Sequence, residues 1–347
     1  MNVVPQPAAP GARPRLEPGD RFPDFVLADQ AGALWSLYQH AQGLPTAVFL
    51  DSDESLRSGL RALAEAYPAA KLNCVVVDAG AQGEASPPRI LADPTGRFRQ
   101  GLREMSGLRG AGPVAFLLDR NQRVLALSAD GDLARWALAR WAEEAPAPAA
   151  AISHAAPVLT VPNVLSRADC RALIKRWHEM GHEAGTVRSM VSGQLVERVY
   201  EEMKKRRDHQ LADPAVRKPL MAMVARRLGP EINKAFCFGS FRFDRVLIAC
   251  YDAERGDYFR RHRDNTTPAT AGRRFALTLN LNSDEYDGGE LIFPEYGDYR
   301  YKPETGAAVV FSCSLLHEAL PVTRGTRFAL LSFLLDPEPA TQPPPRR

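Results

Sequence analysis

The stretch YDAERGDYFRRHRD, from Tyr251 to Asp264, holds the pattern that decides how the C-terminal half of this chain folds. It ends in His262-Arg263-Asp264; a further histidine, His317, follows 53 residues after Asp264, and Arg327 lies ten residues beyond it. A His-x-Asp pair on a β-strand places both side chains on one face, because strand side chains alternate with a period of two. A distant histidine on a neighbouring strand can complete a three-residue set.

Two histidines and one carboxylate on one face of a metal are the ligand set of non-haem Fe(II) oxygenases, which leaves the other positions open for cosubstrate and oxygen. A downstream arginine can bind a carboxylate through two parallel hydrogen bonds, which lysine cannot. Together the four residues predict a dioxygenase that depends on Fe(II) and 2-oxoglutarate. A His-x-Asp pair taken alone is more simply explained as two solvated strand residues, so the flanking sequence has to decide.

The flanking sequence predicts a β-rich domain. Apolar, strand-like runs occupy residues 246–251, 274–281, 307–313 and 327–335, and turns such as Asp287-Gly288-Gly289-Glu290 separate them. Many short strands with turns between them are typical of a β-sandwich or jelly roll. The proposed ligands lie at strand ends or in adjacent loops, where a rigid scaffold usually presents chemistry.

Three motifs of this half resemble the prolyl 4-hydroxylase-type branch of the 2-oxoglutarate/Fe(II) dioxygenases: Tyr251-x4-Gly256-x2-Phe259-x2-His262-x-Asp264, then Asp287-Gly-Gly-Glu-Leu-x-Phe-Pro294, then His317-x9-Arg327. The resemblance covers roughly residues 158–337, with its motif core at 242–337. It implies a double-stranded β-helix (jelly roll) with supporting helices. It also implies that His262, Asp264 and His317 are the iron ligands and that Arg327 binds the distal carboxylate of 2-oxoglutarate.

The same resemblance assigns the rest of the cosubstrate pocket. Tyr251 matches an aromatic residue that often lines this pocket. Relatives often carry a tyrosine on the strand that here reads Thr278 to Leu281, so either Thr278 or Asn280 takes its polar role. The cofactors implied are Fe(II), 2-oxoglutarate and O2, with ascorbate as a reductant. The substrate is unknown; the family analogy favours a prolyl or other side chain of a protein or peptide, and a small molecule is the alternative.

Length and composition allow two domains and exclude several partners. The chain has 347 residues, with 45% hydrophobic and 24% charged residues, values ordinary for a globular protein. A net charge of +3 does not indicate a nucleic acid partner, and no apolar run approaches the ~20 residues that span a membrane. Residues 1–17 read as a disordered tail without a secretory signal, and the five scattered cysteines fit a reduced cytoplasmic chain.

A Pro/Ala-rich segment at residues 142–157 predicts a linker, and residues 338–347 predict a polar tail. The chain is thus predicted to be a multidomain α+β protein. The domain at 18–141 has strands at 46–50 and 73–77, a helix at 55–67, a hairpin at 114–118 and 124–127, and a helix at 133–141. This order is thioredoxin-like. Residues 18–32 and 112–119 resemble elements of peroxiredoxins.

A peroxiredoxin needs a reactive cysteine at the helix start after the first core strand. That place reads Asp51-Ser52-Asp53-Glu54-Ser55, and Cys74 is predicted to be an inert strand residue. We therefore expect this domain to bind rather than react: it could dock against the oxygenase, form a homodimer, or hold a substrate protein. The alternative for the whole chain is a non-catalytic thioredoxin-fold adaptor with a metal-stabilised β-domain, and a thiol peroxidase is a third, poorer hypothesis.

Between the linker and the β-domain, residues 166–180 predict a helix with Ser166 as its N-cap, and residues 218–228 predict a second helix. Residues 195–207 are strongly charged. We interpret them as a solvated helix face or a mobile lid rather than as a basic patch for RNA or an acidic partner, because glutamates balance the basic residues. Loops that cover the substrate are expected at 186–211.

Overall fold

The computed structural model describes residues 15–81, 88–108, 110, 112–144, 151, 154–191 and 194–337. They form two compact units, one within residues 8–150 and the other within 151–347. Half of the predicted linker and all of the predicted C-terminal tail lie outside the described residues. Residues 15–17, predicted to be disordered, are instead part of the first unit: the Leu16 N–H donates to the Met105 carbonyl at 2.7 Å, and the Leu16 side chain is buried.

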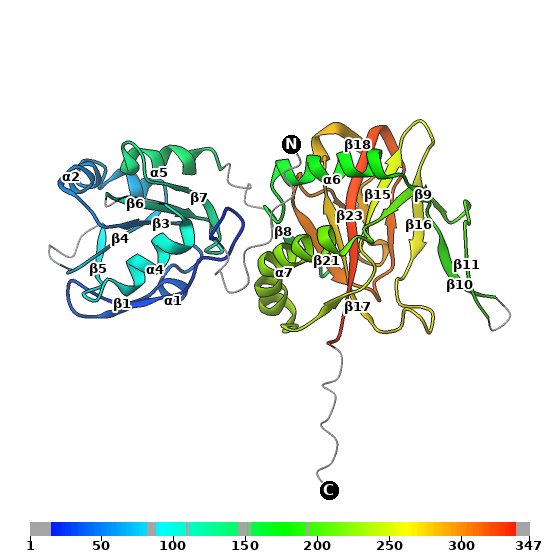
Figure 1. Cartoon of the computed structure of the whole chain (residues 1–347), viewed down its shortest axis with the longest axis horizontal. Helices are drawn as coiled ribbons and strands as arrows, with labels where there is room; N and C mark the ends of the chain where they lie inside the picture. The colour runs from blue at the N-terminus through cyan, green and yellow to red at the C-terminus, as the bar shows by residue number, and fades with distance from the viewer. Residues whose placement is uncertain are drawn as a thin grey trace, which may run out of the picture. The chain divides into compact units, whose positions relative to one another are not determined.

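The first unit is built on one seven-stranded sheet (Figure 1). In spatial order its strands are β2 (Leu34–Ser36), β1 (Val26–Asp29), β5 (Arg89–Ala92), β4 (Asn73–Asp78), β3 (Thr46–Leu50), β6 (Val114–Leu118) and β7 (Val124–Ser128). Strands β3, β4 and β5 run parallel, and β6 pairs antiparallel with β3 and with β7. This arrangement confirms the thioredoxin-like fold that the element order predicted.

Helices cover both faces of this sheet. They are α1 (Leu37–His40), α2 (Glu54–Ala62), α3 (Ala66–Ala69), α4 (Arg97–Ser106) and α5 (Leu133–Ala142). Alternate residues of β3 point to opposite faces: Val48 packs with apolar residues of α1 and α4, and Phe49 packs with those of α2 and α5. The helix predicted at 55–67 is divided in two after Ala62, and Pro68, which has no backbone N–H, lies in the short second piece.

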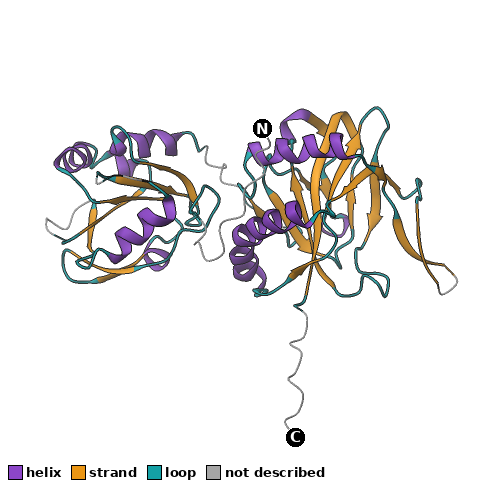
Figure 2. Cartoon of the chain, viewed as in Figure 1, coloured by secondary structure: helices purple, strands orange, loops and turns teal. Residues whose placement is uncertain are grey.

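The second unit contains two stacked sheets, which is the double-stranded β-helix that the resemblance implied (Figure 2). The larger sheet runs β8 (Leu159–Val161), β21 (Ala308–Ser312), β17 (Arg273–Asn280), β23 (Val322–Leu335), β15 (Leu247–Asp252), β13 (Arg207–Gln210) and β9 (Glu183–Ala184), and β14 (Arg242–Phe243) and β18 (Tyr286–Gly288) pair with β23. The smaller sheet runs β12 (Lys204–Lys205), β16 (Tyr258–His262), β22 (His317–Ala319), β19 (Leu291–Ile292) and β20 (Arg300–Tyr301). A separate hairpin joins β10 (Val187–Val191) and β11 (Gln194–Arg198), and single 3-10 turns occupy Ser283–Glu285 and Pro294–Tyr296.

Two helices, α6 (Arg167–Met180) and α7 (Pro214–Phe236), cover the outer face of the larger sheet (Figure 1). Along β15, Ile248 and Cys250 face these helices, whereas Ala249 and Tyr251 belong to an apolar cluster shared with the smaller sheet. This alternation explains why the strand sequence is apolar throughout. The N-cap predicted for Ser166 is confirmed, with a reciprocal capping box to the third residue of α6, and α7 extends beyond the predicted 218–228 at both ends.

The turn after β18 depends on two glycines. Gly288 and Gly289 have φ of +72° and +65°. A Cβ on Gly288 would lie 2.5 Å from the Pro321 carbonyl oxygen, and one on Gly289 would lie 3.1 Å from Cδ of Arg327. Glycine is therefore required where the turn packs beside Arg327. Within the described residues, no helix has the length and apolar character needed to cross a membrane.

Candidate active site

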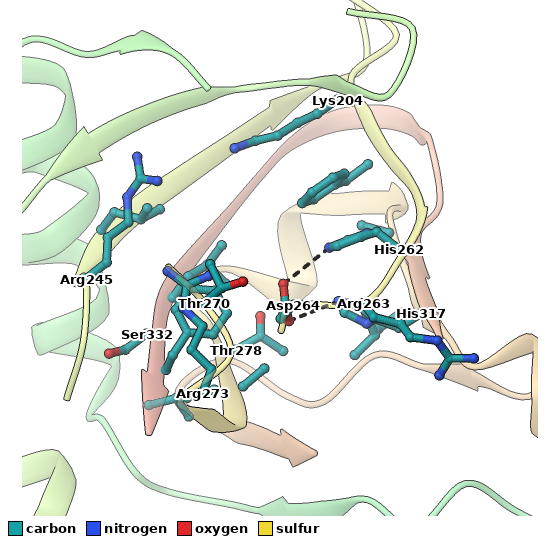
Figure 3. Close-up of a pocket in the computed structure, with 18 of the residues that line it drawn as sticks. Lys204, Arg245, His262, Arg263, Asp264, Thr270, Arg273, Thr278, His317 and Ser332 are labelled. Carbon is teal, nitrogen blue, oxygen red and sulfur yellow. Dashed lines mark ion pairs between the residues drawn. The ribbon is translucent and has the colours of Figure 1, made fainter. Parts of the chain in front are cut away.

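Three side chains from the smaller sheet and its adjoining turn converge at one end of the cavity between the sheets (Figure 3). His262 is the last residue of β16 and His317 the first of β22, and the two are directly opposite each other in the ladder. Nε2 of His262 lies 3.5 Å from Oδ1 of Asp264, and Nε2 of His317 lies 3.4 Å from Oδ2. All three candidate ligand atoms lie within 4.8 Å of one another.

Asp264 does not lie on a strand, contrary to the expectation for the His-x-Asp pair. The strand ends at His262, and Asp264 occupies the following turn, where its N–H donates to the Cys313 carbonyl at 3.0 Å. That bond holds the turn against the end of β21. The carboxylate reaches the two histidines because the turn folds it back, not because of strand alternation.

Both histidines are oriented through their other ring nitrogen. Nδ1 of His262 lies 2.7 Å from the Arg260 carbonyl, and Nδ1 of His317 lies 3.0 Å from the Leu315 carbonyl. A carbonyl accepts only from a protonated nitrogen, so we infer that Nδ1 carries the proton and that Nε2 presents its lone pair toward Asp264. This is the tautomer that a metal ligand requires.

Burial and neighbouring groups set the charges of this cluster. Burial lowers the pKa of His317 to about 4, so His317 is neutral near pH 7. Burial alone would raise the pKa of Asp264, but the adjacent His317 and His262 outweigh it and the net shift is downward. Near pH 7, Asp264 is thus an ionised carboxylate and His317 a neutral imidazole, the forms in which these groups bind a cation.

A cavity of about 390 Å3 adjoins the three residues, and two further predicted residues, Arg327 and Tyr251, line it. Tyr251 on β15 and Arg327 on β23 are paired in the sheet, and Cζ of Arg327 lies 5.1 Å from the Tyr251 ring centroid. Arg327 is only 4% exposed, yet its Nε has no hydrogen-bond partner among the described residues. A buried donor in this condition is rare and indicates a place for a ligand.

Of the two candidates on β17, only Thr278 lines the cavity. Its buried hydroxyl has no hydrogen-bond partner among the described residues. The Asn280 amide instead donates to the Ser283 hydroxyl at 3.0 Å, the Tyr286 hydroxyl at 3.1 Å and the Pro303 carbonyl at 2.9 Å, and its oxygen lies 3.5 Å from Nη2 of Arg327. Asn280 therefore positions Arg327 from outside the cavity.

The charged segment at 195–207 was interpreted incorrectly as a solvated helix face. Its described part is strand and turn, and Lys204 and Arg206 are buried, 3% and 7% exposed, and line the cavity. Thr186 and Met203 line it too, so the expected covering segment does supply part of the wall, although the side chains of residues 187–195 lie outside the described set. The missed signal was the period-two spacing of Lys204, Arg206 and Asp208, which places them on one side of an extended chain.

In the first unit, the place of a peroxiredoxin cysteine is filled by paired polar groups. Asp51 forms ion pairs with Arg99 and with Arg103, the latter at 2.7 Å. The Ser52 hydroxyl donates to Asp78 at 2.5 Å, and the Asp53 side chain caps α2. Cys74 lies on β4, and burial raises the pKa of its thiol, which disfavours the reactive thiolate.

Comparison with known proteins agrees with the second unit's geometry. Residues 246–335 match the family model of the 2OG-Fe(II) oxygenase superfamily. A PKHD-type hydroxylase of Xylella fastidiosa (strain M12) is 28% identical over 185 residues, which cover 50% of this chain and 76% of that protein. A PKHD-type hydroxylase of Cupriavidus metallidurans is 45% identical over 95 residues, 24% of this chain and 42% of that protein.

Among solved structures, a Pseudomonas putida prolyl-4-hydroxylase aligns with 53% of this chain and 94% of its own, at 24% identity and a TM-score of 0.41. The family match shows that the second unit carries a 2OG-Fe(II) oxygenase domain, a family whose chemistry depends on Fe(II) and 2-oxoglutarate.

Proposed function

We propose that this chain is a hydroxylase that binds one Fe(II) through His262, Asp264 and His317 and converts 2-oxoglutarate and O2 into succinate, CO2 and one hydroxylated C–H bond of its substrate. The observation that carries the proposal is the convergence of three ligand atoms within 4.8 Å beside a cavity that holds a buried arginine. Neutral imidazoles and a carboxylate suit Fe(II), and three protein ligands leave positions open. The oxygenase family match supports the same chemistry.

The residues also fit a carboxylate cosubstrate. Arg327 Nε and Thr278 Oγ1 are buried and have no partner in the part of the chain that the structure describes, and an unsatisfied buried polar group costs about 1–3 kcal/mol. A carboxylate accepting from both would remove that cost. We assign these two donors to the distal carboxylate of 2-oxoglutarate, with Tyr251 forming the adjoining wall and Asn280 holding Arg327 in place.

Fe(II), when bound, supplies the redox chemistry that couples 2-oxoglutarate decarboxylation and O2 reduction to C–H hydroxylation. The chain's own residues position and protect. Phe259 stacks on the His262 ring at 3.5 Å between centroids, and Phe311 packs edge-on against His317 at 4.7 Å. Both rings line the cavity, so they fix the imidazole planes and keep water from the reacting end.

We further propose a prolyl or other side chain of a protein or peptide as substrate, because the similar proteins are described as PKHD-type and prolyl hydroxylases. The thioredoxin-like unit would act as a binding module. The absence of a cysteine at residues 51–55 supports a role without thiol chemistry.

Iron binding and succinate release test the proposal together. Purified chain, titrated anaerobically with Fe(II), should bind one equivalent and then release succinate from 2-oxoglutarate in air. The adaptor alternative predicts metal binding with no succinate above the level of metal-free protein. Succinate release without bound iron would contradict the assigned site.

A further inference from the structure

Two buried cations line the cavity beside the proposed iron site and are not used by the chemistry described so far. Lys204 donates to the Thr186 carbonyl at 2.9 Å and to Asp208 at 3.3 Å. Arg206 donates to the Tyr251 hydroxyl at 2.7 Å and to the same Asp208 carboxylate at 3.2 Å. An ammonium has three donors, so the described residues leave one N–H of Lys204 without a partner.

The cluster carries more positive than negative charge. Lys204 and Arg206 share a single carboxylate, Asp208, and all three are at least nine-tenths buried. Burial, with help from Arg206 and Arg245, lowers the pKa of Lys204 to about 7 in spite of Asp208. When Lys204 is protonated, it is a buried cation without a carboxylate of its own, so this side of the cavity then lacks one negative charge. An anion bound beside Lys204 would favour its protonated form.

The other charges that line the cavity do not offset this excess. Arg263 and Arg273 are paired with carboxylates outside the lining, Glu295 and Asp244, and the acidic lining residue, Asp264, is balanced in number by Arg327. The two charges of Fe(II) and the two of 2-oxoglutarate cancel, so loading the site with both does not supply the missing anion. The primary substrate is then the remaining source of this negative charge.

The position of the cluster fits a substrate group. Lys204 Nζ lies 5.3 Å from the ring centroid of Phe259, and that ring stacks on His262. In Figure 3 the Lys204 amine and the Arg245 guanidinium lie across the pocket from His317. A molecule anchored at Lys204 would therefore extend along the Phe259 ring toward the three ligands.

Resting on the function proposed above, we propose that the substrate carries a carboxylate and that Lys204, with Arg206 beside it, binds this group while a C–H bond faces the iron. A cavity of about 390 Å3 that also holds 2-oxoglutarate leaves room for a small group, so we take the source of the carboxylate to be a small acid or the C-terminal residue of a peptide. The carboxylate is the shared chemistry of these two sources.

Matched acids and amides test the inference on the wild-type chain. The probes are N-acetylated proline, leucine and phenylalanine as free acids and as carboxamides, and tripeptides ending in the same residues with free or amidated C-termini. Full-length protein with Fe(II) and 2-oxoglutarate is assayed for stimulated succinate release and for product that has gained one oxygen atom. We expect at least one acid to stimulate about tenfold more than its amide. Stimulation confined to peptides identifies a C-terminus, and stimulation by the amino acid derivatives identifies a small acid.

Neighbouring lysines provide the variant and its control. Lys204→Met keeps the apolar stem and removes the charge, and Lys204→Arg restores a cation. Lys205→Met is the matched control, since Lys205 does not line the cavity and its amine donates to the Arg255 carbonyl. Lys204→Met should reduce the preference for acid over amide to about one, Lys204→Arg should recover part of it, and Lys205→Met should retain it.

Equal stimulation by acids and amides, or no stimulation by any acid of the panel, overturns the inference. It is also overturned if Lys204→Met weakens 2-oxoglutarate binding as much as acid binding, because the cluster would then belong to the cosubstrate. Iron binding and unstimulated succinate release, measured in the same preparations, distinguish these results from failure of the proposed function.

Discussion

The two units differ in whether the polar groups compared below have hydrogen-bond or ion-pair partners. After β3 of the first unit, Asp51, Ser52 and Asp53 each have a partner: arginines for Asp51, Asp78 for Ser52, and the start of α2 for Asp53. In the second unit, the Thr278 hydroxyl and Nε of Arg327 are buried at the cavity with no partner among the described residues. A polar cluster in which every group has a hydrogen-bond partner stabilises the fold, whereas a cluster with unsatisfied groups indicates a ligand site.

The contrast distinguishes the thioredoxin-like unit from the oxygenase-like unit of the same chain. In the first unit, the position where relatives of the fold react has become a network of ion pairs. In the second, the candidate ligand atoms lie within 4.8 Å of one another, and nearby polar groups have no hydrogen-bond partner among the described residues. The following changes should break or sharpen this contrast, and they are ordered by expected effect.

His317→Ala should have the largest effect, because it removes one of three proposed iron ligands. We expect succinate formation to fall at least about a hundredfold, with iron occupancy lost, since catalysis needs the metal and each ligand group. Metal analysis and a succinate assay measure both. The exposed His154→Ala is the control, and wild-type iron content and turnover in His317→Ala would show the site to be wrongly assigned.

Arg327→Ala should raise the 2-oxoglutarate concentration for half-maximal rate at least about tenfold, because a lost hydrogen bond to a charged group costs about 1.5–3 kcal/mol. Steady-state kinetics at varied 2-oxoglutarate give this value. Arg324→Ala is the matched control: Arg324 is exposed and pairs with Asp287 at 2.5 Å. A large increase in Arg324→Ala with none in Arg327→Ala would exchange their roles.

Lys204→Met should change how stability depends on pH. With the pKa of Lys204 near 7 in the folded chain and about 10.4 in the unfolded chain, the unfolded chain binds more protons between these values, so wild-type stability rises with pH there. The slope contributed by this lysine is at most about 1.4 kcal/mol per pH unit. Urea unfolding at pH 7 to 9 should show a shallower rise in Lys204→Met; identical slopes would mean that Lys204 has an ordinary pKa.

Asp51→Asn should destabilise the first unit by about 1–2 kcal/mol, because it removes the negative charge that Arg99 and Arg103 share, and part of this cluster is screened by solvent. Three of the four tryptophans belong to this unit, so fluorescence-monitored urea unfolding follows it. The exposed Asp130→Asn is the control. Succinate formation should not change, and a change would mean that the network serves the reaction.

Thr278→Val should have the smallest effect, and it tests a single hydrogen bond to the cosubstrate. It replaces an unpartnered hydroxyl with an isosteric methyl group, so the free energy of unfolding should stay within about 0.5 kcal/mol or increase. The 2-oxoglutarate requirement should rise about three- to tenfold, the value of one typical hydrogen bond. Ser332→Ala, whose hydroxyl already donates to the Asp244 carbonyl at 3.0 Å, should instead lose stability without changing that requirement. The reverse pattern would remove Thr278 from the cosubstrate site.

Much of the fold could be predicted because its signals are local. The strand at 46–50 and the cap at Ser166 follow from residue type and periodicity within a few positions. The prediction of one helix at 55–67 was only partly correct, since the first helix ends at Ala62 and a second, short helix begins at Ala66. The helix at 218–228 was too short, because apolar periodicity marks the packed face and not the ends.

The sequence by itself determined the identity and spacing of His262, Asp264, His317 and Arg327, and the lack of a cysteine after β3, since these are properties of residues in order. Only the tertiary structure decided the rest. Lys204 and Arg206 are buried because β12 pairs with β16, which lies more than fifty residues away. Thr278 rather than Asn280 faces the cavity unpaired because Ser283, Tyr286 and Pro303 reach Asn280 and nothing described reaches Thr278. Burial and hydrogen-bond satisfaction depend on which distant segments meet, and residue type alone does not contain that information.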